Sequence, residues 1–513
     1  MSPVKARAVM VLGTTSGAGK SWLTTALCRW YARQGLKVAP FKAQNMSNNA
    51  RVVPGLNGEP GEIGSAQYFQ ALAARTVPDV RMNPVLLKPE HDCGSQVVVW
   101  GQVRDDLRAV PWRQRSEALW PHARCALDEL MTENDVVVIE GAGSPAEINL
   151  HASDYVNMRT ALHAQAACLL VTDIDRGGAF AHLYGTHQLL PEAERALIRG
   201  FVLNRFRGDA SLLSPGPEQL QALTGVPTLG VLPMWRGHGL PEEDGVFDDA
   251  PTGAVAGSAS LTRVAVIAYP RLSNLDEFQP LRNTPGVRLS WARHPRDLAG
   301  VDWVILPGSK HTRADLAWLR STGLDQAITA HARAGGAVLG VCGGLQMLGT
   351  HIEDAEGVEG EASGACEGLG LLPLGTVFEA NKRLSVTRAR FAVTTHDADQ
   401  ADVATAHGGT SPWSSLAGVA VQGYEIHHGQ TLAGSTAQAL LFDEDGHALG
   451  WRQGRVLGIY LHGLFEDAAA MRALFGQAAP DLDATFDGLA DFIDQHLGAP
   501  ALMDLLRTSP NSD

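Results

Sequence analysis

The feature of this sequence that most constrains its fold is an apolar run that leads directly into a glycine-rich loop and then into helical periodicity. Arg7–Leu12 predicts a buried strand, Gly13–Ser21 a loop, and Lys20–Gln34 a helix that stops at Gly35. Glycines let backbone N–H groups converge on phosphate oxygens, and the N-terminus of the following helix adds positive charge. This order of elements predicts nucleotide binding; a glycine-rich turn without nucleotide is the alternative. The predicted phosphate ligands are Gly13, Thr14, Thr15, Ser16, Gly17, Ala18, Gly19, Lys20 and Ser21.

The loop departs from the strict phosphate-loop pattern at one position. That pattern places a glycine six residues before the lysine, where this chain has Thr14, and Gly13 lies one residue earlier. We expect Lys20 to reach the β- and γ-phosphates and the Ser21 hydroxyl to bind Mg²⁺. Glu140 is the second predicted Mg²⁺ ligand, because it ends an apolar strand and ligands bind at the carboxyl ends of parallel strands. An acid at a strand end is otherwise often only solvated.

Short apolar runs alternate with helix-period stretches through the first 235 residues. Continuous apolar runs are typical of parallel strands that are covered on both faces. We therefore predict a doubly wound α/β domain over residues 1–235. Its predicted strands are Arg7–Leu12, Lys37–Phe41, Asp135–Ile139, Ala167–Val171, Gly200–Leu203 and Thr228–Leu232.

Two further carboxylates follow one of these strands. Asp173 and Asp175 come just after Ala167–Val171, and Arg176 is next. Their place at a carboxyl end of the sheet makes all three candidate site residues. The residues alone leave open whether the carboxylates bind Mg²⁺ or substrate.

The composition changes after residue 235. Residues 236–260 are rich in Gly, Pro, Ala, Ser and acids without periodicity, which predicts a linker. A second α/β pattern predicts a domain over residues 261–466 whose later strands have few helices between them. Residues 467–513 are predicted to form a helical tail. The predicted strands of this half are Arg263–Tyr269, Val301–Leu306, Ala337–Val341, Arg388–Thr394, Gly418–Ile426 and Val456–Tyr460.

The second half carries its own candidate site. Gly340–Gly344 joins a strand to a helix start and centres on Cys342, which is the pattern of a nucleophile elbow. The helix N-terminus favours the thiolate, and the N–H groups of Gly343 and Gly308 are the predicted oxyanion donors. His462, which ends a late strand, is the predicted base. A lone Cys or His is usually structural, but the combination indicates catalysis. The remaining cysteines are predicted to be inert: Cys28, Cys93, Cys125, Cys168 and Cys366.

Composition excludes several other classes of protein. The net charge of −14 argues against a nucleic acid or an anionic membrane as partner. Six cysteines without a CxxC pair indicate a reducing compartment, and no apolar run reaches the ~18 residues of a membrane helix. We expect a cytoplasmic enzyme that acts on a small molecule, with the oligomeric state left open, a homo-oligomer included.

Both halves resemble known families. The elbow with its distal histidine resembles the class I glutamine amidotransferases, and the first half resembles the dethiobiotin-synthetase-like P-loop ligases. Fused in this order, they resemble the cobyrinic and cobyric acid amidases of cobalamin biosynthesis, and several stretches are most similar to the cobyric acid branch. Those stretches are Lys42–Asn49, Asn83–Pro89, Asp173–Gly178, Asn204–Asp209 and Tyr424–Gly429.

The resemblance implies ATP-dependent amidation of the b, d, e and g carboxylates of adenosylcobyrinic acid a,c-diamide, with glutamine as nitrogen donor. ATP and Mg²⁺ are the implied cofactors, and the corrinoid is substrate. Lys42 would help to spread phosphoryl charge, and Asn204 matches a position where the ligases recognise adenine. The corrin would be bound by neutral amides and basic or acidic groups: Lys42, Gln44, Asn45, Asn48, Asn49, Lys88, Asp173, Asp175 and Arg176.

One departure from the amidotransferase pattern concerns the base. Triad enzymes of that class carry Glu two residues after the histidine, where this chain has Leu464. Glu466 and Glu425 are the nearest acids in the matching motifs, and we predict a Cys–His dyad without an orienting carboxylate. Two alternatives stay open: a sister enzyme that amidates only the a and c carboxylates, and a P-loop ATPase switch with a degenerate amidotransferase module.

Overall fold

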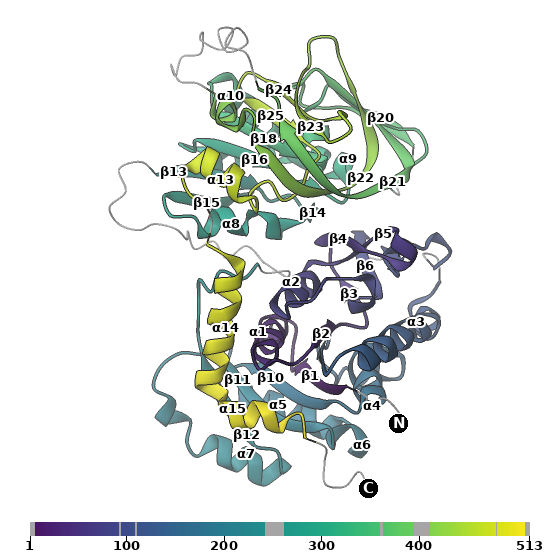
Figure 1. The fold of residues 1–513 in the computed structure, drawn as a ribbon, viewed down its shortest axis with the longest axis vertical. Helices are drawn as coiled ribbons and strands as arrows, with labels where there is room; N and C mark the ends of the chain where they lie inside the picture. The colour runs from purple at the N-terminus through teal and green to yellow at the C-terminus, as the bar shows by residue number, and fades with distance from the viewer. Residues whose placement is uncertain are drawn as a thin grey trace.

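The computed structural model describes residues 6–91, 94–107, 110–241, 261–359, 363–393, 411–478 and 480–507. Two α/β domains are stacked end to end, with the N-terminal domain below and the C-terminal domain above in Figure 1. Of the predicted linker, residues 242–260 lie outside the described residues. We propose the division at 235 and 261 on the strength of the two separate sheets.

Six parallel strands form the centre of the N-terminal domain. They are β1 (Arg7–Gly13), β2 (Val38–Phe41), β9 (Val136–Glu140), β10 (Ala167–Asp173), β11 (Ile198–Phe206) and β12 (Thr228–Pro233), in the spatial order β12-β11-β10-β1-β9-β2. Every neighbouring pair is parallel. All six strands predicted from the apolar runs are therefore confirmed, each to within a few residues.

Helices cover both faces of this sheet. They include α1 (Lys20–Arg33), α2 (Ser65–Ala73), α3 (Trp112–Glu133) and α5 (Ala179–Leu189). Alternate residues of β1 enter two different apolar cores: Met10 and Leu12 pack with α3 and α5, whereas Val9 and Val11 pack with α1. This is the doubly wound arrangement that continuous apolar strands require.

Short strands that the sequence pattern did not indicate lie between the sheet and the upper domain (Figure 1). They form a hairpin of β4 (Ala50–Pro54) and β5 (Pro60–Gly64), and a small sheet of β3 (Asn45–Met46), β6 (Val85–His91), β7 (Gly94–Val99) and β8 (Gln102–Val103). The β4–β5 hairpin contacts the long strands β21 (Leu374–Phe391) and β22 (Ala420–Ala433) of the C-terminal domain.

The C-terminal domain is built on an 11-stranded mixed sheet. Its parallel part consists of β15 (Val287–Ala292), β13 (Thr262–Ile267), β16 (Trp303–Leu306), β18 (Ala337–Val341) and β25 (Val456–Ile459). Antiparallel strands β24 (Ala448–Gln453), β23 (Gln438–Asp443), β21 and β22 extend it. The few helices between the later strands agree with the sequence pattern.

The described part of the C-terminal segment is helical, and its helices pack against different domains. Met471 of α13 (Ala468–Phe475) packs in the core of the C-terminal domain. By contrast, α14 (Leu482–Leu497) runs down beside α1 (Figure 1) and completes a core of the N-terminal domain. Within the described part of the chain, no helix combines the length and apolar character needed to cross a membrane.

Candidate functional site

The carboxyl edge of the N-terminal sheet gathers the predicted nucleotide-site residues. β1 leads into the glycine-rich loop, β9 ends at Glu140, β10 ends at Asp173, and Asn204 lies near the end of β11. Lys42 directly follows β2. Because parallel strands bring their carboxyl ends to one edge, residues separated by as many as 186 positions meet there.

The glycine-rich loop has backbone that only glycine accommodates. Gly17 and Gly19 have φ values of 71° and 94°, in the left-handed region that favours glycine. A Cβ on Gly13 would lie 2.9 Å from the Thr15 carbonyl oxygen and 3.0 Å from Lys20 Cδ. Gly13 therefore allows Thr15 and Lys20 to approach closely, one residue before the position where the strict pattern places its glycine and this chain has Thr14.

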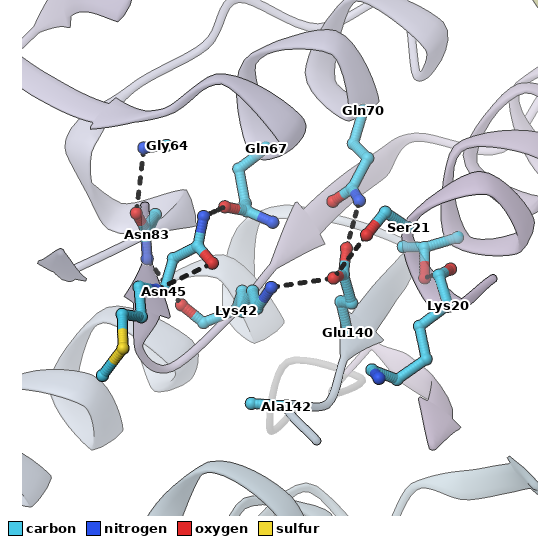
Figure 2. Close-up of polar contacts among 12 residues, drawn as sticks. Lys20, Ser21, Lys42, Asn45, Gly64, Gln67, Gln70, Asn83, Glu140 and Ala142 are labelled. Atoms are coloured by element: carbon cyan, nitrogen blue, oxygen red, sulfur yellow. Dashed lines mark hydrogen bonds and ion pairs between the residues drawn. The ribbon is translucent and has the colours of Figure 1, made fainter. Parts of the chain in front are cut away.

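Glu140 is the centre of a buried polar network at this edge (Figure 2). Its Oε1 accepts hydrogen bonds from Ser21 Oγ at 2.8 Å and Lys42 Nζ at 2.8 Å, and its Oε2 accepts one from Gln70 Nε2 at 2.5 Å. Burial alone would raise the pKa of Glu140, but the Lys42 charge and these hydrogen bonds outweigh burial and lower the pKa. Glu140 is thus held as an anion. Together with the Ser21 hydroxyl, it offers the hard oxygen donors that Mg²⁺ prefers.

Lys20 lies at the end of the loop, and Asn204 of β11 contacts the loop. Lys20 Nζ donates to the carbonyl oxygens of Thr15 at 3.1 Å and Gly143 at 3.2 Å, so its ammonium group sits between the loop and the segment after β9. Asn204 Nδ2 donates to the Ala18 carbonyl at 2.9 Å. The amide of Asn204 therefore fixes the loop in this structure.

The two candidate carboxylates at the end of β10 are held by arginines. Buried Asp173 pairs with Arg205 at 3.0 Å and with Arg176 at 3.4 Å, and Asp175 pairs with Arg207. Arg176 Nη2 lies 3.8 Å from where a Cβ on Gly17 would be. The structure thus brings Arg176 to the phosphate loop, with two thirds of its side chain exposed.

The predicted corrin-binding amides do not share one surface. Asn45 Nδ2 donates to Gln67 at 3.1 Å, and Gln44 accepts from Tyr155 at 2.8 Å. Asn49 accepts from the backbone N–H of Leu275 in the other domain.

Two further candidates also lie toward the domain interface. Asn48 Oδ1 is buried without a hydrogen-bond partner among the described residues. Lys88 forms a buried ion pair with Glu62 at 2.6 Å, and Glu62 also pairs with Lys382 of the C-terminal domain at 2.5 Å. The structure does not place Lys88 with Lys42 at Glu140.

Cys342 occupies a strained turn between β18 and α11 (Gly343–Leu348). Its φ and ψ are 52° and −107°, a conformation that non-glycine residues rarely adopt. A Cβ on Gly344 would lie 1.9 Å from the Leu306 carbonyl oxygen, and one on Gly340 would lie 2.7 Å from Gly344. The two flanking glycines are therefore required for the turn, as the elbow pattern predicted.

His462 is buried and contacts both Cys342 and a carboxylate. Its Nδ1 lies 3.0 Å from Glu277 Oε1, while Glu277 Oε2 accepts the Gly463 N–H at 3.0 Å. Burial lowers the pKa of His462, but the charges of Glu277 and Cys342, with hydrogen bonds from both, raise it to about 10. Since Glu277 occupies Nδ1, Nε2 is the nitrogen left to the thiol.

The predicted Cys–His dyad is therefore wrong. The arrangement is a Cys–His–Glu triad, and the third member comes from a segment 185 residues before the histidine. Neither acid of the matching motifs, Glu466 or Glu425, takes this place. Glu466 pairs with Arg51, and Glu425 binds Thr387, His427 and Arg383.

The predicted oxyanion loop lies beside the elbow. β17 (Gly308–Ser309) pairs with β14 (Leu272–Ser273). A Cβ on Gly343 would lie 2.9 Å from the Ser309 backbone nitrogen, and one on Gly308 would lie 3.0 Å from His462 Cε1. The loop therefore contacts both the elbow and the base, with Ser309 N nearest to Gly343.

The cysteines predicted to be inert lie in different settings. Cys28 and Cys168 are buried, and burial raises the pKa of both thiols. Cys125 is exposed and Cys366 is half-buried; desolvation also raises the pKa of these two thiols, and at Cys125 the neighbouring Glu129 adds to the rise. Cys93 lies outside the described residues.

Several residues of the two sites were missed by sequence reasoning. Gln70 supports Glu140, and Glu277 orients His462. Tyr424 stacks on the His462 ring at 5.2 Å between centroids. No local pattern marks these residues, because each meets its partner only through tertiary structure; Tyr424 alone lay in a motif that had been singled out.

Comparisons with known proteins agree with this two-domain arrangement. The CobQ/CobB/MinD/ParA nucleotide binding domain matches residues 9–237, and the CobB/CobQ-like glutamine amidotransferase domain matches residues 263–470. The chain is 67% identical to the cobyric acid synthase of Leptothrix cholodnii over 98% of this chain and 97% of that protein. It is 68% identical to that of Methylibium petroleiphilum over 98% and 97%, and 67% identical to that of Variovorax paradoxus over 98% and 99%. Both fold predictions are confirmed.

Proposed function

This chain belongs to the cobyric acid synthase family, and on that premise we propose that it amidates the b, d, e and g carboxylates of adenosylcobyrinic acid a,c-diamide to give adenosylcobyric acid. Glutamine supplies the nitrogen and ATP the free energy. The observation that carries the proposal is the presence of a phosphate site and a Cys–His–Glu site in one chain. A reducing cytoplasm suits the free thiols of the described cysteines.

In the glutaminase half, the Cys342 thiolate attacks the side-chain carboxamide carbon of glutamine. His462, protonated and held by Glu277, gives its proton to the departing ammonia, which leaves a γ-glutamyl thioester on the sulfur. His462 then takes a proton from water as the water attacks the thioester, and glutamate is released. Backbone N–H groups at Gly343 and the neighbouring loop stabilise the oxyanion of each tetrahedral intermediate.

In the synthetase half, a corrin carboxylate attacks the γ-phosphorus of ATP, so that an acyl phosphate forms and ADP leaves. The Lys20 ammonium and the loop N–H groups offset the charge of the transferring phosphoryl group. Ser21 and Glu140 would hold Mg²⁺, which would neutralise phosphate charge when bound there. Ammonia then attacks the acyl carbon, and inorganic phosphate departs with formation of the amide.

Product masses test the proposal. The protein is incubated with ATP, glutamine and either cobyrinic acid or its a,c-diamide. We expect four successive amidations of the a,c-diamide. Two amidations of cobyrinic acid with the a,c-diamide left unchanged would assign the chain to the sister reaction. ATP turnover that ignores both corrinoid and glutamine would identify an ATPase switch instead.

A further inference from the structure

A buried arginine of the N-terminal domain reaches into the C-terminal domain. Arg51 lies in β4, and its side chain is only 2% exposed. Its guanidinium donates to Asp276 Oδ2 from Nε at 2.9 Å and from Nη2, and to Glu466 from Nη1 at 2.8 Å and Nη2 at 2.5 Å. It also lies 4.9 Å from the centroid of the Tyr424 ring. One cation thus binds three separate segments of the other domain.

The first of these segments carries the carboxylate that orients the base. Asp276 and Glu277 are adjacent in a single 3₁₀ turn, Leu275–Phe278. Arg51 holds Asp276, while Glu277 accepts from His462 Nδ1. A displacement of Asp276 would therefore move its neighbour away from the imidazole.

The other two segments also touch His462. The Tyr424 ring stacks on the imidazole with an interplanar angle of 16°, and the backbones of the two residues exchange hydrogen bonds of 2.9 and 3.2 Å. Glu466 belongs to the loop that follows the histidine, where its N–H donates to the Gly463 carbonyl at 2.9 Å. All three partners of Arg51 thus lie in segments that contact or directly adjoin the base: Tyr424 touches His462 itself, Asp276 precedes Glu277, and Glu466 binds Gly463.

The residues that precede Arg51 fix the same turn. The Ala50 N–H donates to Asn274 Oδ1, and Asn49 Oδ1 accepts from the Leu275 N–H, both at 3.0 Å. Asn274 Nδ2 in turn lies 3.4 Å from His462 Nδ1. Three consecutive residues, 49–51, therefore bind three consecutive residues, 274–276, in the turn beside the base.

We propose that Arg51 is a positioning residue for glutamine hydrolysis, supplied to the glutaminase site by the synthetase domain. The planar guanidinium can bind two carboxylates and an aromatic ring at once, which a lysine ammonium cannot do. Without it, the buried Asp276 carboxylate would be left without its counter-ion, a costly state that displaces the turn. The glutaminase site is thus incomplete without the other domain. This inference rests on the proposed glutaminase activity.

The test compares Arg51→Met and Arg51→Lys with the unmodified full-length chain. We expect Arg51→Met to lower kcat for glutamine hydrolysis by about 30-fold, since a misplaced base costs catalysis more than substrate binding. KM for glutamine should change by less than about threefold, and amidation from ammonium chloride should persist. Arg51→Lys should recover part of kcat. Unchanged hydrolysis, or equal losses with both nitrogen sources, would overturn the proposal.

The pH dependence of Cys342 alkylation by iodoacetamide, followed by peptide mass spectrometry, gives a readout that needs no turnover. Loss of the oriented imidazole should change this profile, because His462 is the group that takes the thiol proton. If the unmodified chain releases no ammonia from glutamine, the proposed function fails while the alkylation profile still decides the role of Arg51. Should Arg51→Met not fold, the double variant Arg51→Met/Asp276→Asn removes the cation and its carboxylate partner together. The same change in the pH profile of Cys342 alkylation is expected for it.

Two control variants separate positioning from general structure. Arg29→Met removes another fully buried arginine, which binds Asp483 and Asp487 of α14 far from the base. Lys382→Met removes an ion pair at the same domain interface that touches none of the three partners of Arg51. Both should leave glutamine kcat and the alkylation profile unchanged. A shift in either control as large as that of Arg51→Met would contradict the assignment.

Discussion

The two sites each depend on a buried carboxylate, and the two carboxylates are held in different ways. Glu140 receives its hydrogen bonds from Ser21, Lys42 and Gln70, all of the N-terminal domain. Glu277 orients His462, but the turn that carries it is fixed by Arg51 and Asn49 from the other domain. The synthetase site is thus supported within its own domain, whereas the glutaminase site is supported from both.

This difference fits the order of the chemistry. An acyl phosphate that forms without ammonia is lost only when water reaches it, but glutamine that is hydrolysed without an acceptor is wasted at once. A glutaminase whose base is held by the synthetase domain is active only when the two domains are docked. Variants of either site should therefore lower one half-reaction, glutamine hydrolysis or ATP-dependent amidation, more than the other. The glutaminase site should also respond to changes in the synthetase domain.

The largest difference between the two half-reactions is expected from Cys342→Ala. Removal of the nucleophile should lower glutamine hydrolysis by about 10⁴-fold or more. Amidation from ammonium chloride should stay within about twofold, because none of the contacts described for Lys20, Ser21 and Glu140 involves this thiol. Hydrolysis is measured as glutamate release and amidation as corrinoid mass. Equal loss of both activities would show that the sites are not separable.

Lys20→Ala tests the opposite case, in which amidation is lost and glutamine hydrolysis is retained. Loss of the ammonium group beside the phosphates should lower amidation from either nitrogen source by about 10³-fold. Glutamine hydrolysis should persist within about threefold, because Arg51 and Asn49 remain in place. Retained amidation would contradict the role of the loop. Hydrolysis that falls together with amidation would show that nucleotide binding, and not docking alone, activates the base.

Most of the N-terminal sheet could be predicted from the sequence because its strands are buried on both faces and read as continuous apolar runs. The loop from Gly13 to Ser21 and the elbow at Cys342 could also be predicted, because the spacing of their glycines and the strand and helix on either side define them locally. The hairpin β4–β5 was not predicted. Its Val53 and Ile63 pack against Val80 of its own domain, and the hairpin also contacts β21 and β22 of the other domain. Nearly every residue of the hairpin is buried, so no alternation of apolar and polar residues marks it in the sequence.

The part of the site that could not be predicted is the part made by tertiary contacts. The family pattern directed attention to Leu464, Glu466 and Glu425 as the places for an orienting acid, but the acid is Glu277. Its sequence neighbourhood contains nothing that distinguishes it from Asp276, and only the fold decides which of the two faces the base. The missed role of Arg51 has the same cause.

Glu277→Gln should have the next largest effect. It changes the glutaminase site, which is supported from both domains. A neutral amide keeps the shape but stabilises the imidazolium less, so we expect kcat for glutamine hydrolysis to fall about 100-fold with ammonia-dependent amidation retained. The pKa of His462 should fall from about 10.

The same variant has a signed effect on stability. Since the folded-state pKa of His462 lies above its ordinary 6.5, its stabilising contribution is fully present below that value and is lost as the pH rises through about 10. Urea unfolding should therefore show the variant less stable than the unmodified chain near pH 6, with the gap narrowing by about pH 10. A gap that does not change with pH would show that Glu277 does not act through the charge of His462.

The smallest effect is expected from substitutions of Gln70, which donates a hydrogen bond to Glu140 in the synthetase site. Gln70→Leu removes one of three donors to Glu140, and a hydrogen bond to a charged group is worth about 1.5–3 kcal/mol, so amidation should fall about tenfold while glutamine hydrolysis is unchanged. Gln70→Glu should be worse than Gln70→Leu, because it places a second carboxylate where an amide now donates at 2.5 Å. ATP-dependent amidation from ammonium chloride measures both variants. If Gln70→Glu were the milder change, Glu140 would have to be protonated in the folded protein, and the ligand set for a divalent cation at Ser21 and Glu140 would be contradicted.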